Sequence, residues 1–404
     1  MSESTKEMLV PKLRFPEFQD TEEWNNTLLG NCLDYLQPTK YLVKSTAYDD
    51  SYKTPVLTAG KTFILGYTDE SSGIFKKKLP AIIFDDFTTA TKFVDFPFKA
   101  KSSAMKILLA RENTNIKFIY EAMQAIKYEV GAHQRHWISK FTTLNIIIPP
   151  PSEQQKIADF LASIDDLITA QAKKIEVLKV HKKGLMQKLF PAEGKSIPKL
   201  RFPEFRDTKK WKKQKLEKVA TFLKGRSISK SDVTTDGKQP CIRYGELYTL
   251  YNETIENISS YTNIPTNNLV MSKANDVIIP ASGETQEDIA TASCVINGGI
   301  ALGGDLNIIR STMNGVFLSY YLNSAKKNSI AQLSQGISVV HLYTSQLKKL
   351  DISTPALPEQ QKIADCLASI DELITAQTKK IEALNVHKKG LMQQIFPTVG
   401  EVGA

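Results

Sequence analysis

The sequence predicts an α+β fold in which two mixed α/β inserts are separated by two long helices. This prediction rests on two segments that each occur twice in the sequence. Pro11–Trp24 and Pro198–Trp211 are identical at 11 of 14 positions, at an offset of 187 residues. Glu153–Pro191 and Glu359–Pro397 are identical at 32 of 39 positions, at an offset of 206. The stretches between these repeats do not match each other. Two constant frames therefore hold two different inserts, and we expect the frames to do one shared task twice.

The repeats divide the chain of 404 residues into successive segments. At roughly 100–200 residues per domain, this length predicts two to four domains, and each insert is itself of domain size. The predicted segments are an N-terminal tag (1–24), a first insert (25–150), a central long helix (151–191), a linker with the repeated tag (192–211), a second insert (212–357), a C-terminal long helix (358–397) and a tail (398–404).

The segment after each insert is predicted to be a long helix of roughly 55 Å, at 1.5 Å per residue. Pro149–Pro151 cannot continue a helix, and Ser152 with Gln155 three residues later has the pattern of a capping box. In the second copy, Pro358 suits a first helical position. Apolar residues then recur in steps of four and three over about five heptads, which favours pairing along a seam. The predicted seam contains Ile157, Leu161, Ile164, Ile168, Ile175, Leu178, Ile363, Leu367, Ile370, Ile374, Ile381 and Leu384.

Polar residues interrupt the seam at equivalent places, Gln171 with Lys182 and Gln377 with Lys388. They reflect either partial solvation near frayed ends or the setting of register between the two helices. We expect the helices to pack on each other, and the alternative is that each packs only on its own insert. If they are antiparallel, they hold the inserts at opposite ends of a rod with pseudo-twofold symmetry.

Lysines cluster on what we expect to be an outer face of each long helix. Such a charge run fits a solvated face, or the docking of two copies of another subunit, since the run is duplicated. The lysines are Lys173, Lys174, Lys179, Lys182 and Lys183 in the first copy, and Lys379, Lys380, Lys388 and Lys389 in the second.

Both inserts are predicted to be mixed α/β. Strand-like runs such as Ala81–Phe84 alternate with turns rich in Gly, Asn, Asp and Pro. Gly131 and Gly336 each precede a histidine by five residues, His136 and His341. This common spacing predicts that the inserts share a fold in spite of their diverged sequences.

The charge permits a nucleic-acid partner without requiring one. The net charge is +9, from 52 Lys and Arg against 43 Asp and Glu. Both inserts share the excess, with 16 basic and 11 acidic residues in 25–148 and 15 and 12 in 212–355. No apolar run approaches the roughly 18–20 residues of a membrane helix, and the first ten residues lack a secretory pattern. We therefore expect a cytoplasmic protein.

The cysteines and the one Gly-Lys-Thr triplet do not form recognisable sites. The four cysteines are widely scattered and no pair has CxxC spacing, which argues against a zinc site and a disulfide framework. Gly60-Lys61-Thr62 resembles the end of a P-loop, but Pro55 stands where that motif requires glycine.

Other catalytic patterns are also weak. Asp85 and Asp86 could be metal ligands, but a turn or a surface pair is the simpler interpretation. His133 and His136 have a spacing that can hold a metal, yet the second insert has only His341, so a phosphate contact or a packed histidine is simpler. No nucleophile elbow and no Asn-Pro-Pro-aromatic motif of adenine methyltransferases occurs. We predict a protein that recognises rather than catalyses, with no bound metal.

The repeated motifs carry a resemblance to a known family. PKLRFPEF before each insert, EQQKIA at the start of each long helix and KKGLMQ near its end are similar to the specificity subunit of type I restriction-modification enzymes. The resemblance spans both tags, both inserts and both helices. RYGELY at Arg243–Tyr248 is typical of the target recognition domains of that family, whereas the first insert has no such motif.

The resemblance implies a complete functional plan. Each insert would be a target recognition domain that reads one half of a bipartite DNA site, and the helices would form an antiparallel coiled coil that sets the distance between the half-sites. Two methyltransferase subunits with S-adenosylmethionine, and two restriction subunits with ATP and Mg, would join this chain in the bacterial cytoplasm. The chain itself would bind double-stranded DNA and hold no cofactor. It would catalyse neither the methylation nor the cleavage of DNA.

Polar loop residues are the candidates for DNA contacts, since their side chains can read base edges or meet phosphates. Each such loop also has the simpler interpretation of an ordinary solvated loop. The candidates in the first insert are Lys61, Tyr67, Lys76, Lys77, Thr88, Thr89, Thr91, Lys92, Arg135 and His136. Those in the second insert are Arg226, Ser227, Lys230, Arg243, Tyr244, Ser282, Thr285, Gln286, Ser338, His341 and Tyr343.

Three other functions remain open. A stand-alone DNA-binding regulator would bind specifically without partner subunits. A hidden nuclease or methyltransferase would react when S-adenosylmethionine or Mg²⁺ is added to the purified chain and DNA. A coiled-coil scaffold without nucleic acid is disfavoured by the two inserts.

Overall fold

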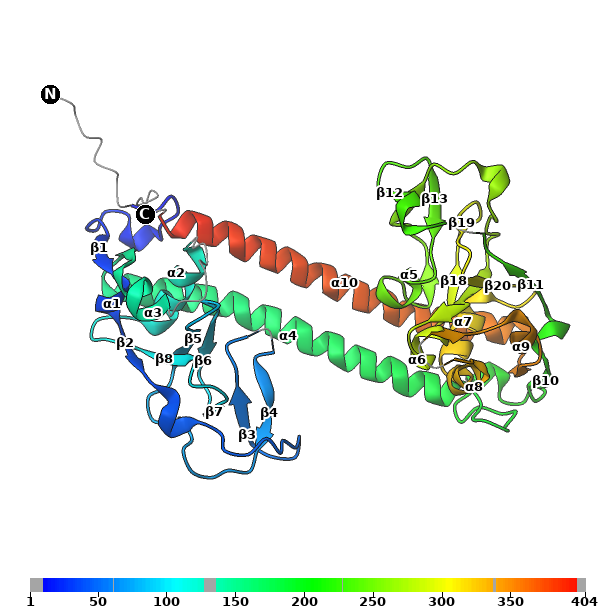
Figure 1. Ribbon diagram of the computed structural model, residues 1–404, viewed down its shortest axis with the longest axis horizontal. Helices are drawn as coiled ribbons and strands as arrows, with labels where there is room; N and C mark the ends of the chain where they lie inside the picture. The colour runs from blue at the N-terminus through cyan, green and yellow to red at the C-terminus, as the bar shows by residue number, and fades with distance from the viewer. Residues whose placement is uncertain (1–9, 61, 127–135, 227, 337–338, 398–404) are drawn as a thin grey trace. The chain divides into compact units, whose positions relative to one another are not determined.

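The computed structural model describes residues 10–60, 62–126, 136–226, 228–336 and 339–397 (Figure 1). The chain forms two compact units. Unit 1 contains the described residues up to Ala172 together with those from Lys379 onward, and unit 2 contains Lys173–Thr378. The long helices are α4 (Pro151–Leu189) and α10 (Leu357–Ile395), and each contributes one end to each unit.

Unit 1 contains two main sheets. The first has the antiparallel order β2-β8-β5-β6, and α2 packs against β5 and β6. The second has the order β4-β3-β7, with β3 and β7 parallel. The elements are α1 (Leu29–Cys32), β2 (Leu33–Leu36), β3 (Thr54–Leu57), β4 (Ile64–Thr68), β5 (Ala81–Asp85), β6 (Thr91–Val94), β7 (Lys99–Ala100), β8 (Met105–Ala110), α2 (Ile116–Ala125) and α3 (His136–Ser139).

Unit 2 also contains two main sheets, in the orders β11-β20-β16-β18-β14 and β12-β15-β13-β19. A short pair, β17 with β21, accompanies them. The strands are β11 (Ala220–Lys224), β12 (Val233–Thr234), β13 (Gln239–Ile242), β14 (Thr254–Ile255), β15 (Ser260–Thr262), β16 (Asp276–Pro280), β17 (Ser282–Gly283), β18 (Ser293–Val295), β19 (Ala301–Leu302), β20 (Leu306–Ser311) and β21 (Val340–His341). The helices are α5 (Glu246–Thr249), α6 (Gln286–Ile289), α7 (Gly315–Asn323), α8 (Lys327–Leu333) and α9 (Thr344–Lys348).

The two inserts share their strand order although their sequences differ. The order β2-β8-β5-β6 in unit 1 corresponds to β11-β20-β16-β18 in unit 2, and all of these pairs are antiparallel. The second sheets share a parallel pair, β3 with β7 and β13 with β19. Each insert is closed by pairing between its first and last strands, β1 (Asn25–Leu28) with β9 (Asn145–Ile148) and β10 (Lys212–Lys215) with β22 (Asp351–Thr354).

The two histidines that follow a glycine by five residues do not occupy equivalent positions in the two inserts. In unit 1 the backbone N–H of His136 donates to the carbonyl of Asp86, directly after β5, and in unit 2 the N–H of Leu342 donates to that of Ala281, directly after β16. His136 therefore corresponds to Leu342, and His341 lies one residue earlier. The surroundings of the two histidines differ accordingly, since His136 is buried at the start of α3 and His341 is exposed in β21.

The ends of the two long helices run in opposite directions within each unit. In unit 1, Asp165 of α4 meets Lys388 of α10, and the earlier residue Ile157 shares a core with the later residue Ile395. In unit 2, Lys182 of α4 meets Asp371 of α10. All the predicted seam residues are buried or half-buried, because they lie on the side of each helix that faces protein.

The helix starts differ slightly from the sequence-based prediction. α4 begins at Pro151, the first residue of the predicted segment 151–191, so Ser152 lies inside the helix rather than before it, and α10 begins at Leu357, one residue before the predicted segment 358–397. The side-chain amide of Gln155 donates to Asp159, so Gln155 does not close the predicted capping box with that group. No helix within the described part of the chain is long and apolar enough to cross a membrane.

Candidate nucleic-acid interface

The Glu-Gln-Gln triplet at the start of α4 joins the tag and the first insert to the helix. Glu153 is buried and accepts two hydrogen bonds of 2.8 Å from Arg14 of the tag. Gln154 accepts from the backbone N–H of Asn115 at 2.9 Å, and Gln155 accepts from its side-chain amide at 2.8 Å. Asn115 is the N-cap of α2. The triplet therefore fixes where α2 begins relative to α4.

Unit 2 repeats this arrangement residue by residue. Glu359 accepts from Arg201 at 2.7 and 2.6 Å. Gln360 accepts from the backbone N–H of Asn314 at 3.0 Å, and Gln361 accepts from its side-chain amide at 2.8 Å. Asn314 is the N-cap of α7. One motif therefore mounts one helix of each insert in the same way.

An aromatic side chain that follows each long helix completes the same mounting. In unit 1, Trp24 packs against Phe118 of α2, which in turn packs against Phe396 after α10. The corresponding stack in unit 2 consists of Trp211, Phe317 of α7 and Phe190 after α4. The tag, the insert and the helix of the other repeat thus share one core in each unit.

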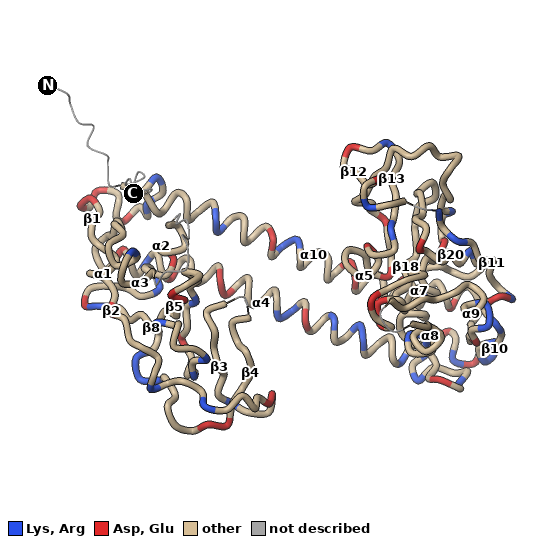
Figure 2. Tube along the Cα trace, in the orientation of Figure 1, with Lys and Arg blue, Asp and Glu red and all other residues tan. Residues whose placement is uncertain are grey.

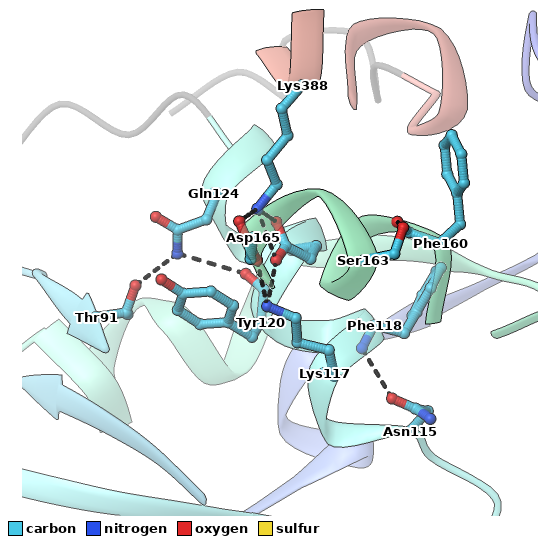
Figure 3. Close-up of polar contacts among 11 residues, drawn as sticks. Thr91, Asn115, Lys117, Phe118, Tyr120, Gln124, Phe160, Ser163, Asp165 and Lys388 are labelled. Carbon is cyan, nitrogen blue, oxygen red and sulfur yellow. Dashed lines mark hydrogen bonds and ion pairs between the residues drawn. The ribbon is translucent and has the colours of Figure 1, made fainter. Parts of the chain in front are cut away.

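A cluster of charges joins α2, α4 and α10 in unit 1 (Figure 3). The Lys388 ammonium lies 2.7 Å from Asp165 and 3.0 Å from Glu121, and Lys117 lies 2.7 Å from both carboxylates. Burial disfavours the charged form of Asp165, but the hydrogen bonds from Lys117 and Lys388 outweigh it and lower the pKa of Asp165. Lys388 is therefore bound within the unit, and its assignment to a solvated outer face was wrong.

Lys182 is held equivalently in unit 2, so its assignment to the outer face was also wrong. Its ammonium lies 2.7 Å from Asp371 of α10 and 2.8 Å from Glu253. Tyr320 of α7 donates its hydroxyl to Asp371 at 2.5 Å, and burial together with that carboxylate raises the pKa of Tyr320. In each unit the polar interruption pairs with an aspartate of the other helix, which supports the register-setting interpretation of these lysines.

The second insert carries a basic pocket of about 580 Å³ between its two main sheets. Arg226, Arg243 and Tyr244 of the predicted set line it. The Arg243 side chain donates to the carbonyl of Ile228 at 3.2 Å, and its backbone N–H donates to Glu246 at 2.7 Å. These local bonds hold the arginine of the RYGELY motif, and the tyrosine that follows it also lines the pocket.

Sequence reasoning missed part of this pocket. Lys224 and the turn at residues 303–305 also line it. A side chain at Gly225 would place a Cβ atom 1.9 Å from the carbonyl oxygen of Gly303, so the close approach of these two backbones requires glycine. The Gly303-Gly304-Asp305 sequence was the signal that could have identified this turn.

The remaining described candidates of the second insert have different surroundings. Ser282 pairs with His341 across the β17–β21 pair, and Tyr343 stacks beside His341 with ring centroids 6.3 Å apart. Thr285 is the N-cap of α6, and its hydroxyl accepts a hydrogen bond from the backbone N–H of Asp288. Gln286 and Lys230 are exposed.

The first insert has a pocket of about 550 Å³ that Tyr67 and Lys76 of the predicted set line together with Lys53, which was not predicted. Lys77 is exposed beside it. The preceding loop is fixed by Glu70, which pairs with buried Lys99 at 2.8 Å. The hydrogen bond from Lys99 and the backbone bonds at Ser45 and Lys44 lower the pKa of Glu70 to about 2.

Several candidates of the first insert lie around the turn between β5 and β6. Asp85 accepts backbone hydrogen bonds from Phe87 and Thr88, which confirms that it serves a turn. Thr89 has a left-handed backbone (φ +59°), and Thr91 accepts a hydrogen bond of 2.6 Å from Gln124 of α2 (Figure 3). Lys92 of β6 lies 5.9 Å above the ring of Phe63, the residue that directly precedes β4.

Asp86 is not the surface residue that the sequence suggested. It is buried, lies 3.2 Å from Lys106 and accepts a hydrogen bond of 2.9 Å from the backbone N–H of Trp137. His136, beside it, is also buried, so its side chain is not available to DNA in this conformation. Both residues belong to the packed interior because Asp86 holds the start of α3.

A family model described as "Type I restriction modification DNA specificity domain" matches residues 21–180 and 208–386. The chain belongs to this family. It is 32% identical over 369 residues to the type I restriction enzyme EcoR124I/EcoR124II specificity subunit of Escherichia coli, with 87% of each chain covered. It is 30% identical over 264 residues to the putative type I restriction enzyme MjaX specificity subunit of Methanocaldococcus jannaschii, covering 63% of this chain and 58% of the relative.

Solved structures support the fold of this family member. A type I restriction-modification S subunit from M. genitalium matches 96% of this chain and 100% of its own, with a TM-score of 0.60 at 15% identity. A chain from a structure on complex assembly and conformational transition of the type I system covers 92% of this chain and 96% of its own, with a TM-score of 0.53 at 16% identity. At these identities the likeness shows the fold alone.

The names of the relatives are relevant to the prediction that this chain recognises DNA and does not catalyse a reaction. The relatives are named specificity subunits, which agrees with a recognition component. Within the described residues, no group of three or more His, Cys, Asp and Glu side chains could hold a metal ion. Basic and acidic residues are interspersed over the described parts of this specificity subunit (Figure 2).

Four of the predicted DNA-contact residues of this specificity subunit lie outside the described residues. They are Lys61, Arg135, Ser227 and Ser338, together with His133 and Gly131 of the other sequence-based interpretations.

Proposed function

We propose that this specificity subunit reads a bipartite DNA site, one half with each insert. The observation that carries this proposal is that two inserts with the same strand order are mounted by identical contacts on a duplicated frame. The long helices would set the distance between the half-sites as an antiparallel coiled coil with pseudo-twofold symmetry. Two methyltransferase subunits would dock on the frame, and the complex would methylate adenine or, with two restriction subunits, cleave unmodified DNA.

The pockets of the two inserts are the proposed recognition surfaces. Arginine can bind guanine with two hydrogen bonds, and lysine and arginine neutralise phosphates. Arg226 and Arg243 in one insert, and Lys53, Tyr67 and Lys76 in the other, supply this chemistry. We carry forward as DNA contacts the described candidates Lys77, Thr88, Thr89, Thr91, Lys92, Lys230, Tyr244, Ser282, Thr285, Gln286, His341 and Tyr343.

The proposed division of labour places the chemistry on the partner subunits. S-adenosylmethionine would be bound by the methyltransferase subunits, and ATP and Mg²⁺ by the restriction subunits.

The decisive experiment is to map N6-methyladenine across the host genome with and without this chain, and to measure specific DNA binding by the purified chain alone and with methyltransferase subunits. We expect methylation at one bipartite motif to vanish without the chain, and tight binding only in the complex. Tight specific binding by the chain alone would favour a stand-alone regulator instead.

We expect Arg226→Ala to weaken specific DNA binding by the methyltransferase complex by roughly 10- to 100-fold, which is the range for loss of a base contact. The loss should disappear when the second half-site is scrambled, because Arg226 belongs to the second insert. Competition binding with matched and scrambled duplexes measures this. Lys218→Ala, at an exposed lysine of the same insert, is the control, and an equal loss in both variants would contradict the assignment.

We expect that shortening the helices shortens the distance between half-sites. Deleting residues 169–175 and 378–384 removes one heptad from each helix between the two lysine–aspartate pairs and leaves both pairs in place. Seven residues correspond to about 10 Å of helix, or about three base pairs. Methylation mapping should show a shorter spacer or a loss of activity. An unchanged spacer with full activity would exclude a ruler.

Each unit has a duplicated pair of exposed apolar side chains that suits docking of a partner. Leu167 and Leu373 are 52% and 51% exposed, and Val386 and Val180 are 72% and 71% exposed. Leu167 with Val386 belongs to unit 1, and Leu373 with Val180 to unit 2. Large apolar residues that recur in such equivalent, exposed positions favour a partner that is met twice.

We therefore expect Leu167→Asn with Val386→Asn to reduce the number of methyltransferase subunits bound per chain from two to one. Light scattering of the purified complex measures this stoichiometry. Val177→Asn is a matched control, because Val177 is 61% exposed on α4 but its counterpart in the repeat is Ala383. Two bound subunits in the double variant, or an equal loss in the control, would contradict docking at this pair.

A further inference from the structure

The lysine–aspartate pairs of the two units are chemically the same feature. Lys388 with Asp165, and Lys182 with Asp371, are both 2.7 Å apart and are related by the offset of 206 between the repeats. In each pair one residue comes from α4 and the other from α10. The frame therefore presents an identical pair of opposite charges, which we call the frame socket, to each insert.

Each insert places a different side chain against the frame socket at the same point of its mounted helix. Glu121 follows the N-cap Asn115 of α2 by six residues, and Tyr320 follows the N-cap Asn314 of α7 by six. The Glu121 carboxylate bonds the socket lysine, whereas the Tyr320 hydroxyl bonds the socket aspartate. Equivalent glutamines of the frame hold both N-caps. The difference between Glu121 and Tyr320 therefore belongs to the inserts and not to the frame.

Each insert also provides the carboxylate that the socket lysine needs in addition to the socket aspartate. In unit 1 this carboxylate is Glu121 itself. Lys117 also pairs with Glu121, so the two lysines neutralise the two carboxylates of the cluster. In unit 2 it comes from Glu253, which lies in sequence just before β14. The lysine ammonium groups are largely buried, so an insert without such a carboxylate would leave a buried charge poorly compensated.

We propose that the frame socket is a shared attachment point that orients each insert, and that an insert is accepted only if it brings its own carboxylate to the socket lysine. Glu121 and Glu253 are then positioning residues that act through Lys388 and Lys182. This inference goes beyond the proposed function, and its test does not depend on which DNA is read.

The test is a double-mutant cycle in the full chain with Lys388→Met, Glu121→Gln and both together. Each single variant should lower the melting temperature by roughly 5–10 °C, since breaking a largely buried pair exposes an uncompensated charge. The double variant should lose clearly less than the sum of the two, because neither charge remains. Lys389→Met, at the exposed neighbouring lysine, should leave the melting temperature unchanged within about 1 °C.

Amide hydrogen exchange supplies the readout that general destabilisation would not give. Lys388→Met should increase exchange in α2 and leave α7 protected, and Lys182→Met should do the reverse. Additive single variants, or equal loss of protection in α2 and α7, would overturn the proposal. If the Lys388→Met chain does not fold, the double variant should restore folding, and its failure to do so while Lys389→Met folds would also overturn the proposal.

Discussion

Replacing residues 25–150 by the insert of another specificity subunit should change one half of the methylated DNA sequence and leave the other half unchanged. The expected effect is all-or-none at the first half-site, since every base contact there would come from the exchanged insert. The present insert is closed by its own first and last strands, β1 and β9, and the incoming insert would bring its own closing pair and leave the frame and the second insert unchanged. Methylation mapping of cells that carry the hybrid chain measures the outcome.

The reciprocal exchange is the matched control for this experiment. Replacing residues 212–357 should change only the other half of the site. The incoming insert should keep an asparagine equivalent to Asn115, since that residue receives the two glutamine contacts of α4. A hybrid in which both halves change, or in which neither does, would contradict independent reading by the two inserts.

The largest loss of stability is expected for Glu153→Ala. Glu153 has no exposed surface and accepts two hydrogen bonds from the Arg14 guanidinium, which also donates to the tag carbonyls of Thr21 and Glu22. Removing one partner of a buried pair leaves the other charge uncompensated, which costs about 3–5 kcal/mol. Denaturant unfolding of the full chain, followed by a probe in unit 1, measures the loss.

Two further variants define what the Glu153 result means. Lys156→Ala removes an exposed pair with Glu17, and it should cost about 1 kcal/mol or less. Arg14→Met combined with Glu153→Leu removes both charges and should cost less than Glu153→Ala alone. If Glu153→Ala costs no more than Lys156→Ala, the buried pair does not hold the tag to the helix.

The frame could be predicted from the sequence because its segments occur twice. Repetition located both helices and both tags, and the heptad spacing identified residues that are buried or half-buried. The roles of Glu153, Gln154 and Gln155 could not be predicted in the same way. Their partners Arg14 and Asn115 lie 139 and 39–40 residues away in the sequence, and only the folded chain brings them together.

The candidate site was less predictable because the inserts have no repeat to guide them. Two residues of the RYGELY motif line a pocket, whereas Lys224 has no motif of its own and lines the same pocket because it ends β11. Asp86 and His136 were assigned by residue type, and a polar side chain does not reveal whether a partner such as Lys106 accompanies it into the interior. A spacing of five residues also could not reveal the one-residue shift between His136 and His341.

The backbone N–H of Leu13 donates to the carbonyl of Gln394, so unit 1 contains residues from both ends of the sequence, whereas unit 2 is one continuous stretch. A ribosome releases all residues of unit 2 before it makes the end of α10. The first insert is therefore synthesised first but completed last, and Phe118 stays without Phe396 in the meantime. A premature stop near residue 378 should consequently damage the early-made insert and spare the late-made one.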